Sequence, residues 1–456
     1  MKRGPKPRWI AVWLALALVG AACSSRDDDD GGAQTETGGG DAAASSSIDT
    51  ENCASDPTQE IEGDVIKLAS SYPQSGLTAA FSEIARGWES YLEKVNADGG
   101  VDIGDRTFTF EFVDMDDQYN AAETAQNVEE MIGQDGSGAF GTFSVVGTAN
   151  NIAIRDFLGD LCVPDMFAAT GSPAWGNPDF PWLIGSTLAP YTLEGQMFAQ
   201  VLQDQKPDAK VAMLVQDDDF GRAYEEGFKQ AIEGTDIEVV KTERYPTGAS
   251  EVSAQITSLA ASGADAFFDG GTLLACPDAL TKAAAANWKP ITWVSGTCIS
   301  KTLMGLAGAA ADGVYSAGNL KDPLNPDWDD DAAMQEYLDT VQQYRPDDFD
   351  PENAIVAYGY TQAAVFVEAL KAAEAPTRLA VMESLHNLDG ISDVGLLLPG
   401  VSVTTGEDDP YMGESLMLAQ YDFIGDGQRN HFVPQGDLVG FEGKTLDLTP
   451  QDLVTG

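Results

Sequence analysis

Residues that commonly carry out catalysis are scarce in this chain. It has only two histidines, His386 and His431, and no Gly-x-Ser-x-Gly segment that would present a nucleophilic serine. The chain therefore has few residues from which a histidine-based triad or a zinc site could be built. Carboxylates are abundant, but their spacing singles out no pair of acid and base. We expect no enzyme activity, no catalytic residue, no metal site and no cofactor.

Two glycine-rich segments are spelled like phosphate-binding motifs. Residues 136–141 match Gly-x-Gly-x-x-Gly, but that motif needs a strand before it and a helix opening within it. Here a helical pattern comes first and a strand pattern runs through the segment. Gly443-Lys444-Thr445 matches the end of a P-loop, yet Leu438 occupies the position of the required first glycine. We therefore predict no nucleotide site at either segment.

The charge of the chain excludes another class of partner. Among 456 residues, 25 Lys and Arg stand against 73 Asp and Glu, which gives a formal net charge of −48. Such a surface repels phosphates, so we expect no nucleic-acid partner. The length suggests two or three domains, and 43% hydrophobic residues are enough to build buried cores.

The N-terminal segment has the layout of an export signal. Four basic residues within the first eight precede an apolar run at 9–19, small residues at 20–22 and then Cys23. A cysteine at this point resembles a bacterial lipobox, although Gly20 replaces its usual Leu; the alternative is an ordinary signal with an incidental cysteine. We predict a signal peptide at 1–22, lipidation of Cys23, and a flexible acidic tether of Gly and Ser at 23–60 that holds the protein at the outer face of the cell membrane.

The body alternates between short β-branched or aromatic runs and longer stretches of helical period. This pattern predicts an α/β fold of two Rossmann-like lobes with parallel central sheets, joined by a multi-strand hinge. A long apolar helix at 354–373 lies beyond the second set of strands, which indicates that the chain crosses back. We place lobe I at 61–186 and about 297–400, and lobe II at 187–296 and about 401–456. The predicted strands are 65–69, 107–113, 138–142, 163–167, 211–216, 237–244, 266–269 and 291–295.

Four cysteines besides Cys23 allow three pairings. Cys276 and Cys298 each follow the end of consecutive predicted strands, whereas Cys53 and Cys162 each precede a strand. Because like ends of parallel strands share a sheet edge, the pairs 276 with 298 and 53 with 162 are favoured. The alternative is reduced, buried thiols. Disulfides would persist in an exported protein.

Ligands of open parallel sheets bind beyond the carboxyl ends of the strands. The loops at these positions are rich in Ser, Thr and Gly and lie near helix starts, which suits a carboxylate or another small polar group. They are residues 70–76, 141–148, 167–171, 216–221 and 270–278.

At these residues the chain resembles the type I solute-binding proteins of ABC importers, specifically the branched-chain amino-acid-binding (Leu/Ile/Val-binding) family, over about 66–422. The matching pieces are Pro73-x-Ser75-Gly76, Val163-Pro164 leading to Ala168-Ala169-Thr170, Asp217-Asp218-Asp219-Phe220-Gly221, Gly263-Ala264-Asp265-Ala266 and Gly313-Val314-Tyr315.

The resemblance implies a ligand-binding role for residues of both lobes. It implies that the segments Ala168 to Thr170 and Thr142 to Ser144 hold a ligand carboxylate, and we also expect Ser75 to bind the ligand. It also implies that Phe81 and Phe220 wall the site and that Asp278 takes an ammonium group. Three departures from the family pattern weaken the expectation that the ligand is a branched-chain amino acid. Val145-Val146 follows Ser144, Phe220 replaces a Tyr, and the loop before Asp278 is longer.

The expected function is capture of a small polar solute, an amino acid or a related carboxylate or amide, and its delivery to ABC permease subunits. A sensing receptor on the same fold is the alternative, and a surface hydrolase is a third.

Overall fold

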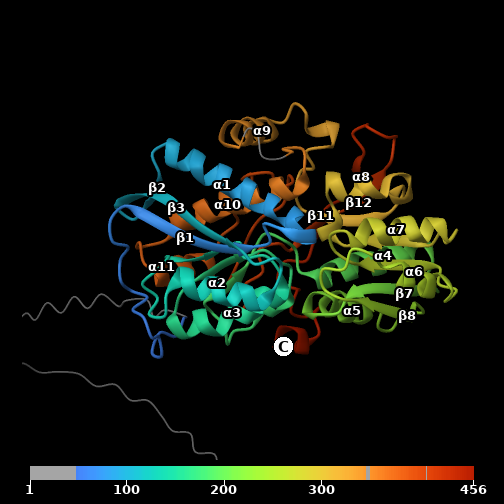
Figure 1. Cartoon of the computed structure of the whole chain (residues 1–456), viewed down its shortest axis with the longest axis horizontal. Coiled ribbons are helices and arrows are strands. Elements are labelled where there is room, and N and C mark those ends of the chain that lie inside the picture. Colours follow the sequence, from blue (N-terminus) through green and yellow to red (C-terminus); the bar gives the residue numbers. More distant parts are fainter. Residues whose placement is uncertain (1–47, 346–349, 407, 456) are drawn as a thin grey trace, which may run out of the picture. The chain divides into compact units, whose positions relative to one another are not determined.

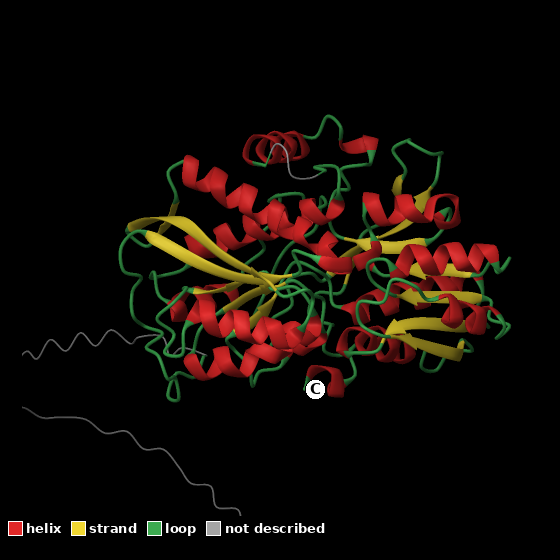
Figure 2. Ribbon diagram, viewed as in Figure 1, coloured by secondary structure: helices red, strands yellow, loops and turns green. Residues whose placement is uncertain are grey.

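The computed structural model describes residues 48–345, 350–406 and 408–455. The predicted signal peptide, Cys23 and the tether up to residue 47 lie outside these residues. Within them the chain forms two α/β lobes, each built around its own sheet (Figures 1 and 2). None of the helices in this part of the chain combines the length and the apolarity needed to cross a bilayer.

The first lobe contains a six-stranded sheet in the order β2-β3-β1-β4-β5-β6, parallel except for the β2–β3 pair. Its strands are β1 (Val65–Tyr72), β2 (Val101–Ile103), β3 (Arg106–Asp116), β4 (Gly141–Phe143), β5 (Asp165–Ala168) and β6 (Leu183–Gly185). The central strand β1 is buried on both faces, as expected for a parallel sheet covered by helices. The carboxyl ends of β1, β4 and β5 therefore lie along one edge.

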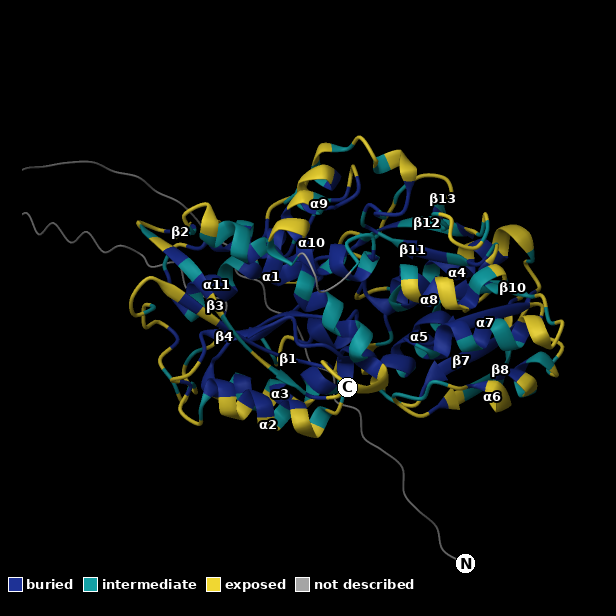
Figure 3. Ribbon diagram, turned by 45° about the horizontal axis from the view of Figure 1, so that its top comes forward, coloured by how far each residue is buried: buried dark blue, intermediate teal, exposed yellow. Residues whose placement is uncertain are grey.

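Helices cover both faces of the first sheet (Figures 1 and 3). On one face lie α1 (Ser82–Ala97), α10 (Ala354–Ala372) and α11 (Arg378–Leu385); on the other lie α2 (Ala121–Ile132) and α3 (Thr148–Leu161). The backbones of α1 and α10 meet at Gly87 and Gly359, where an added Cβ would lie 2.1 Å from Val356 O and 1.9 Å from Ile84 O. Only glycine permits this approach, and it fixes the long apolar helix against the first lobe.

The second lobe contains an eight-stranded sheet in the order β13-β12-β11-β10-β9-β7-β8, with β14 paired to β12. Its parallel part is β7 (Lys210–Gln216), β8 (Glu238–Tyr245), β9 (Ala266–Gly270), β10 (Ile291–Val294) and β11 (Tyr315–Gly318); β12 (Ser415–Asp422), β13 (His431–Pro434) and β14 (Val439–Gly440) are antiparallel. Its helices are α4 (Tyr191–Gln205), α5 (Asp219–Ala231), α6 (Ser253–Ala260), α7 (Ala275–Ala285), α8 (Lys301–Ala307) and the short α12 (Gln451–Val454).

The chain passes between the lobes three times, after β6, after β11 and before β12. Asn319 links the first two passages, since its Nδ2 donates to the backbone oxygen of Thr187 at 2.7 Å. The first return comes later than the predicted residue 297, because β11 pairs with β10 (Trp293 with Tyr315) and extends the second sheet. The region around α8 also packs with Cys276 and Leu280 in the second lobe.

The predicted tether at 23–60 is wrong for its described end, residues 48–60. Ile48 is buried in the first core, and the backbone N–H of Ala54 donates to Asp160 O at 2.9 Å. Cys53 forms a disulfide with Cys162, which fixes this segment to the first lobe. The second disulfide joins Cys276 and Cys298, so both favoured pairings are present.

The glycine-rich segment 136–141 has a structural role. The guanidinium of Arg378 donates to the backbone oxygens of Gly136, Ala139 and Phe140 at 2.7, 3.0 and 2.8 Å. A Cβ on Gly138 would lie 2.2 Å from the oxygen of Met131, so this position needs a glycine. These contacts explain why the segment is rich in glycine, and no bound nucleotide is needed to explain it.

Candidate functional site

A cavity of about 180 Å³ is lined by residues of both lobes. Most of them follow the carboxyl ends of strands, where parallel sheets place their ligand sites. Ala169 and Thr170 follow β5 in the first lobe, and Thr272 and Thr297 follow β9 and β10 in the second. The further lining is largely apolar: Phe81, Ile84, Tyr119, Val146, Leu188, Tyr191, Phe220, Ile299, Leu320, Trp328, Ile355, Tyr358 and Met417.

Thr170 is the polar centre of the first lobe's wall. Its side chain is buried, and its Oγ1 lies 2.6 Å from Thr148 Oγ1 and 3.1 Å from the hydroxyl of Tyr191. Trp175 Nε1 donates to the backbone oxygen of Thr170 at 2.9 Å, which holds the loop in place. Three hydroxyls make two hydrogen bonds among themselves, so one hydroxyl hydrogen of the cluster is available for an acceptor.

The first turn of α3 adds to this preference for an acceptor. Val146 and Gly147 line the cavity directly before Thr148 begins the helix, and Gly147 has a φ of 108°. The N–H groups of a first turn have no partner within the helix, and the helix dipole favours a negative group there. The wall formed by the first lobe is therefore suited to an oxygen with partial or full negative charge.

Aromatic rings form much of the remaining wall. The Phe81 and Tyr119 rings of the first lobe have centroids 5.7 Å apart. The rings of Tyr191 and Phe220, from α4 and α5, are 5.1 Å apart and nearly perpendicular. Phe220 is placed by the start of α5, where the carboxylate of Asp218 accepts from the N–H of Gly221 and caps the helix.

Glu194 is a buried carboxyl group in the lining. Its Oε1 accepts from the hydroxyl of Tyr224 at 2.7 Å, and its Oε2 accepts from the N–H of Gly296 at 2.8 Å and from Trp293 Nε1 at 3.3 Å. Burial raises its pKa to about 7, although these three donors favour the charged form.

Four residues predicted from the sequence line the cavity: Phe81, Ala169, Thr170 and Phe220. The others are not in the lining. The hydroxyl of Ser75 donates to Asp116, and that of Thr142 donates to Asp165 at 2.7 Å in the interior of the first lobe.

The Ser144 hydroxyl accepts from Gln362 Nε2 at 2.6 Å, and Ala168 packs beside Trp175. Asp278 also points elsewhere, because its Oδ2 accepts from the N–H of Val252 at 2.7 Å.

Sequence reasoning did not single out Tyr119, Tyr191 and Thr272. Tyr119 follows β3, and the rule of carboxyl-end loops would have found it. Thr272 lies within the loop 270–278, one of the loops expected to bind the ligand, but only the charged residue Asp278 of this loop was assigned a ligand role. Tyr191 begins α4 after the first passage between lobes, and no local signal marks it.

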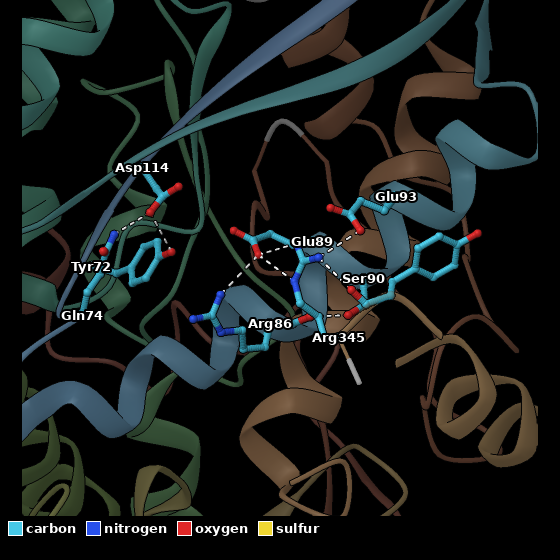
Figure 4. Close-up of polar contacts among 9 residues, drawn as sticks. Tyr72, Gln74, Arg86, Glu89, Ser90, Glu93, Asp114 and Arg345 are labelled. Atoms are coloured by element: carbon cyan, nitrogen blue, oxygen red, sulfur yellow. Dashed lines mark hydrogen bonds and ion pairs between the residues drawn. The ribbon is translucent and has the colours of Figure 1, made fainter. Parts of the chain in front are cut away.

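Two other polar clusters lie apart from the cavity. In the first, Arg345 donates to Glu89 and Glu93 of α1 (Figure 4). In the second, Asp409, Glu414 and Glu442 lie close together, and the N–H groups of Gly443 and Thr445 donate to Glu414 at 2.9 and 3.2 Å. The loop that is spelled like a P-loop thus binds an internal carboxylate.

Comparisons with known proteins agree with this architecture. A family model described as periplasmic binding protein matches residues 65–428. A search of curated protein sequences finds no match.

Similar solved structures include three ABC transporter proteins. One is a branched-chain amino acid ABC transporter from Thermus thermophilus with bound valine (19% identity, 83% of this chain and 97% of that chain, TM-score 0.72). Another is a substrate-binding protein from Aeropyrum pernix (15% identity, 86% of this chain and 100% of that chain, TM-score 0.72). A third is a fatty acid ABC transporter substrate-binding protein from Thermomonospora curvata (18% identity, 84% of this chain and 94% of that chain, TM-score 0.67). At these identities the likeness concerns the fold.

Two α/β lobes with a cavity lined by residues of both have the type I periplasmic-binding-protein fold. Since the family model covers most of its length, the chain belongs to the periplasmic binding protein family.

Proposed function

We propose that the chain captures a small solute bearing a carboxylate or carbonyl group outside the cytoplasmic membrane and delivers it to an ABC permease. The observation that carries this proposal is the cavity lined by Thr170 from the first lobe and Phe220 from the second. A solute held there touches both lobes, so it stabilises the state in which they are close, and a permease can distinguish that state from an open one.

Thr170 is assigned to the acceptor oxygen of the solute. The hydroxyl cluster of Thr148, Thr170 and Tyr191 has a hydrogen to donate, and the start of α3 favours negative charge. Ala169 is assigned to the wall beside this oxygen, and Phe81 and Phe220 to the walls around the rest of the solute.

The Thr170→Val variant tests this assignment, because valine keeps the branched shape and removes the hydroxyl. We expect the Kd of any carboxylate solute, measured by calorimetry, to rise about thirtyfold. Thr340→Val is the matched control, since Thr340 is a buried threonine of α9 (Ala332–Tyr344) whose hydroxyl donates to Glu336 O at 2.7 Å away from the cavity. An unchanged Kd in Thr170→Val would contradict the assignment.

The lipid anchor belongs to the same proposal and has its own test. The layout of residues 1–22 before Cys23 supports lipidation of that cysteine. Cys23→Ser should release the protein from membranes or leave it unprocessed in cell fractionation. Normal membrane retention of this variant would contradict the anchor without affecting the ligand site.

A further inference from the structure

Two cations of the second lobe pair with carboxylates of the first lobe. Lys301 begins α8, and its Nζ lies 2.6 Å from Glu352 Oε2 and 2.6 Å from Asp350 Oδ2. Arg429 lies in the loop between β12 and β13, and its Nη1 is 2.8 and 3.0 Å from the two oxygens of Asp329. The acids and the cations therefore come from distant parts of the chain.

The three acids flank α9, which belongs to the first lobe. Asp329 lies shortly before α9, whereas Asp350 and Glu352 lie between α9 and α10. The ring of Tyr337 on α9 packs against Tyr360 on α10 with centroids 5.0 Å apart, and its hydroxyl donates to Pro351 O at 2.6 Å. Because α9 packs in this way on α1 and α10 (Figure 1), its flanks must move with the first lobe.

The two cations are held by the second lobe. Met304 of α8 shares a core with Cys276 and Leu280 of α7 and with Val294 of β10. The strands β12 and β13 on either side of Arg429 are part of the second sheet. The ion pairs therefore link the lobes in addition to the three passages of the chain.

The charge of the chain gives these pairs their importance. Both lobes contain more Asp and Glu than Lys and Arg, so they repel one another as they approach. Cations are few, 25 against 73 acids, and two of them stand where the lobes meet. Their attraction offsets the repulsion at this contact, and it is largely lost once the charges are more than about 10 Å apart in dilute salt.

We propose that Lys301 and Arg429 form an electrostatic latch between the lobes, which closes when the lobes come together and breaks when they separate. The latch acts in the solute-free chain and adds to the stabilisation that a bound solute contributes. It goes beyond solute capture, because it sets the equilibrium between close and separated lobes before any solute binds.

The exposure of the paired groups sets the size of the effect. The side chains of the five residues are between 38% and 53% exposed, so water screens each pair. A pair of this kind shifts an equilibrium by about threefold, and the loss of both pairs shifts it by about tenfold.

Distances between spin labels test the latch in the full chain without solute. The labels are attached at two exposed positions, Asp339→Cys on α9 and Ala285→Cys on α7. A Cys23→Ser background leaves no other thiol free, because the remaining cysteines form disulfides. Pulsed electron–electron resonance then gives the ratio of close to separated lobes. Lys301→Met should lower this ratio about threefold, and adding Arg429→Met should lower it about tenfold in total.

Lys229→Met is the matched control. Lys229 also lies between two carboxylates, those of Glu225 and Glu226 at 2.8 and 3.0 Å, and it is 40% exposed, but all three residues belong to α5. This variant removes the same charge from the second lobe without removing a contact between lobes, so the ratio should stay close to that of the unmodified chain. Lys301→Arg keeps the charge and should also keep the ratio.

The latch is overturned if Lys301→Met and the double variant leave the ratio unchanged, or if Lys229→Met lowers it as much as Lys301→Met does. A single distance that is the same in every variant overturns it as well. None of these results bears on solute capture, which Thr170→Val tests separately.

Discussion

At the scale of single residues, Asp278 connects two helices. Its Oδ2 accepts from the N–H of Val252, the residue before α6, and its Oδ1 lies 3.6 Å from Lys282 Nζ on α7. We expect Asp278→Ala to lower the free energy of unfolding by about 1 kcal/mol and to leave the solute Kd unchanged, as measured by denaturant unfolding and calorimetry. Asp278→Asn should lose less stability, because its amide oxygen can still accept. A tenfold rise in the solute Kd for either variant would show that Asp278 contributes to ligand binding after all.

The direction of a side chain limits what sequence alone predicts about such residues. Thr170 and Phe220 line the cavity because parallel strands place their following loops at one edge, whereas the expectation for Phe81, which also lines it, came from the family resemblance. Ser144 was misplaced because its hydroxyl meets Gln362, which lies on a helix that returns from a distant part of the chain. Thr142 was misplaced for a similar reason, since its partner Asp165 belongs to the neighbouring strand.

At the scale of elements, Arg345 fastens the end of α9 to α1. Its Nε and Nη2 donate to Glu89 Oε2 at 3.1 and 2.6 Å, and its Nη1 donates to Glu93 Oε2 at 2.9 Å (Figure 4). Burial raises the pKa of Glu89, so this carboxylate depends on the neighbouring cations. Arg86 remains 3.8 Å from Glu89 and can offset part of a loss.

We therefore expect Arg345→Met to lower the free energy of unfolding by about 2 to 3 kcal/mol. The control is Lys371→Met on α10, whose pair with Glu368 is half exposed and contributes at most about 0.5 kcal/mol. Adding Glu89→Gln to Arg345→Met should recover part of the loss, because it removes the stranded charge. If Arg345→Met and Lys371→Met are equally stable in chemical denaturation, the hydrogen bonds from Arg345 to Glu89 and Glu93 do not contribute to the stability of the fold.

The elements themselves were largely predictable. The strand patterns at 65–69, 107–113, 211–216 and 266–269 correspond to β1, β3, β7 and β9. The antiparallel strands β12 and β13 were not predicted: β13 has only four residues, and β12 is half-buried and pairs with β11, about a hundred residues earlier in the chain. Pairing at that distance leaves no local pattern.

At the scale of the whole molecule, buried carboxyl groups govern the response to pH, and three of them have a pKa near neutrality. Burial raises the pKa of Asp165, Glu194 and Glu414 to about 7 in each case, from ordinary values of 3.8, 4.5 and 4.5. Between pH 4.5 and 7 the folded protein therefore holds protons that the unfolded chain has released. The free energy of unfolding must therefore fall as pH rises through this window.

We expect the Tm to be higher at pH 5 than at pH 8, and Asp165→Asn tests the cause. Asp165 is fully buried; its Oδ1 accepts from Thr142, whereas its Oδ2 has no partner, so ionisation strands a charge. An amide keeps the acceptor and cannot ionise, so the variant should gain stability at pH 8 relative to pH 5 and show a flatter profile. Asp135→Asn is the control, because Ser137 donates to this exposed carboxylate and lowers its pKa, which places its titration below the window. A Tm that rises from pH 5 to pH 8, or an Asp165→Asn profile as steep as that of the unmodified chain, would contradict this account of buried neutral acids.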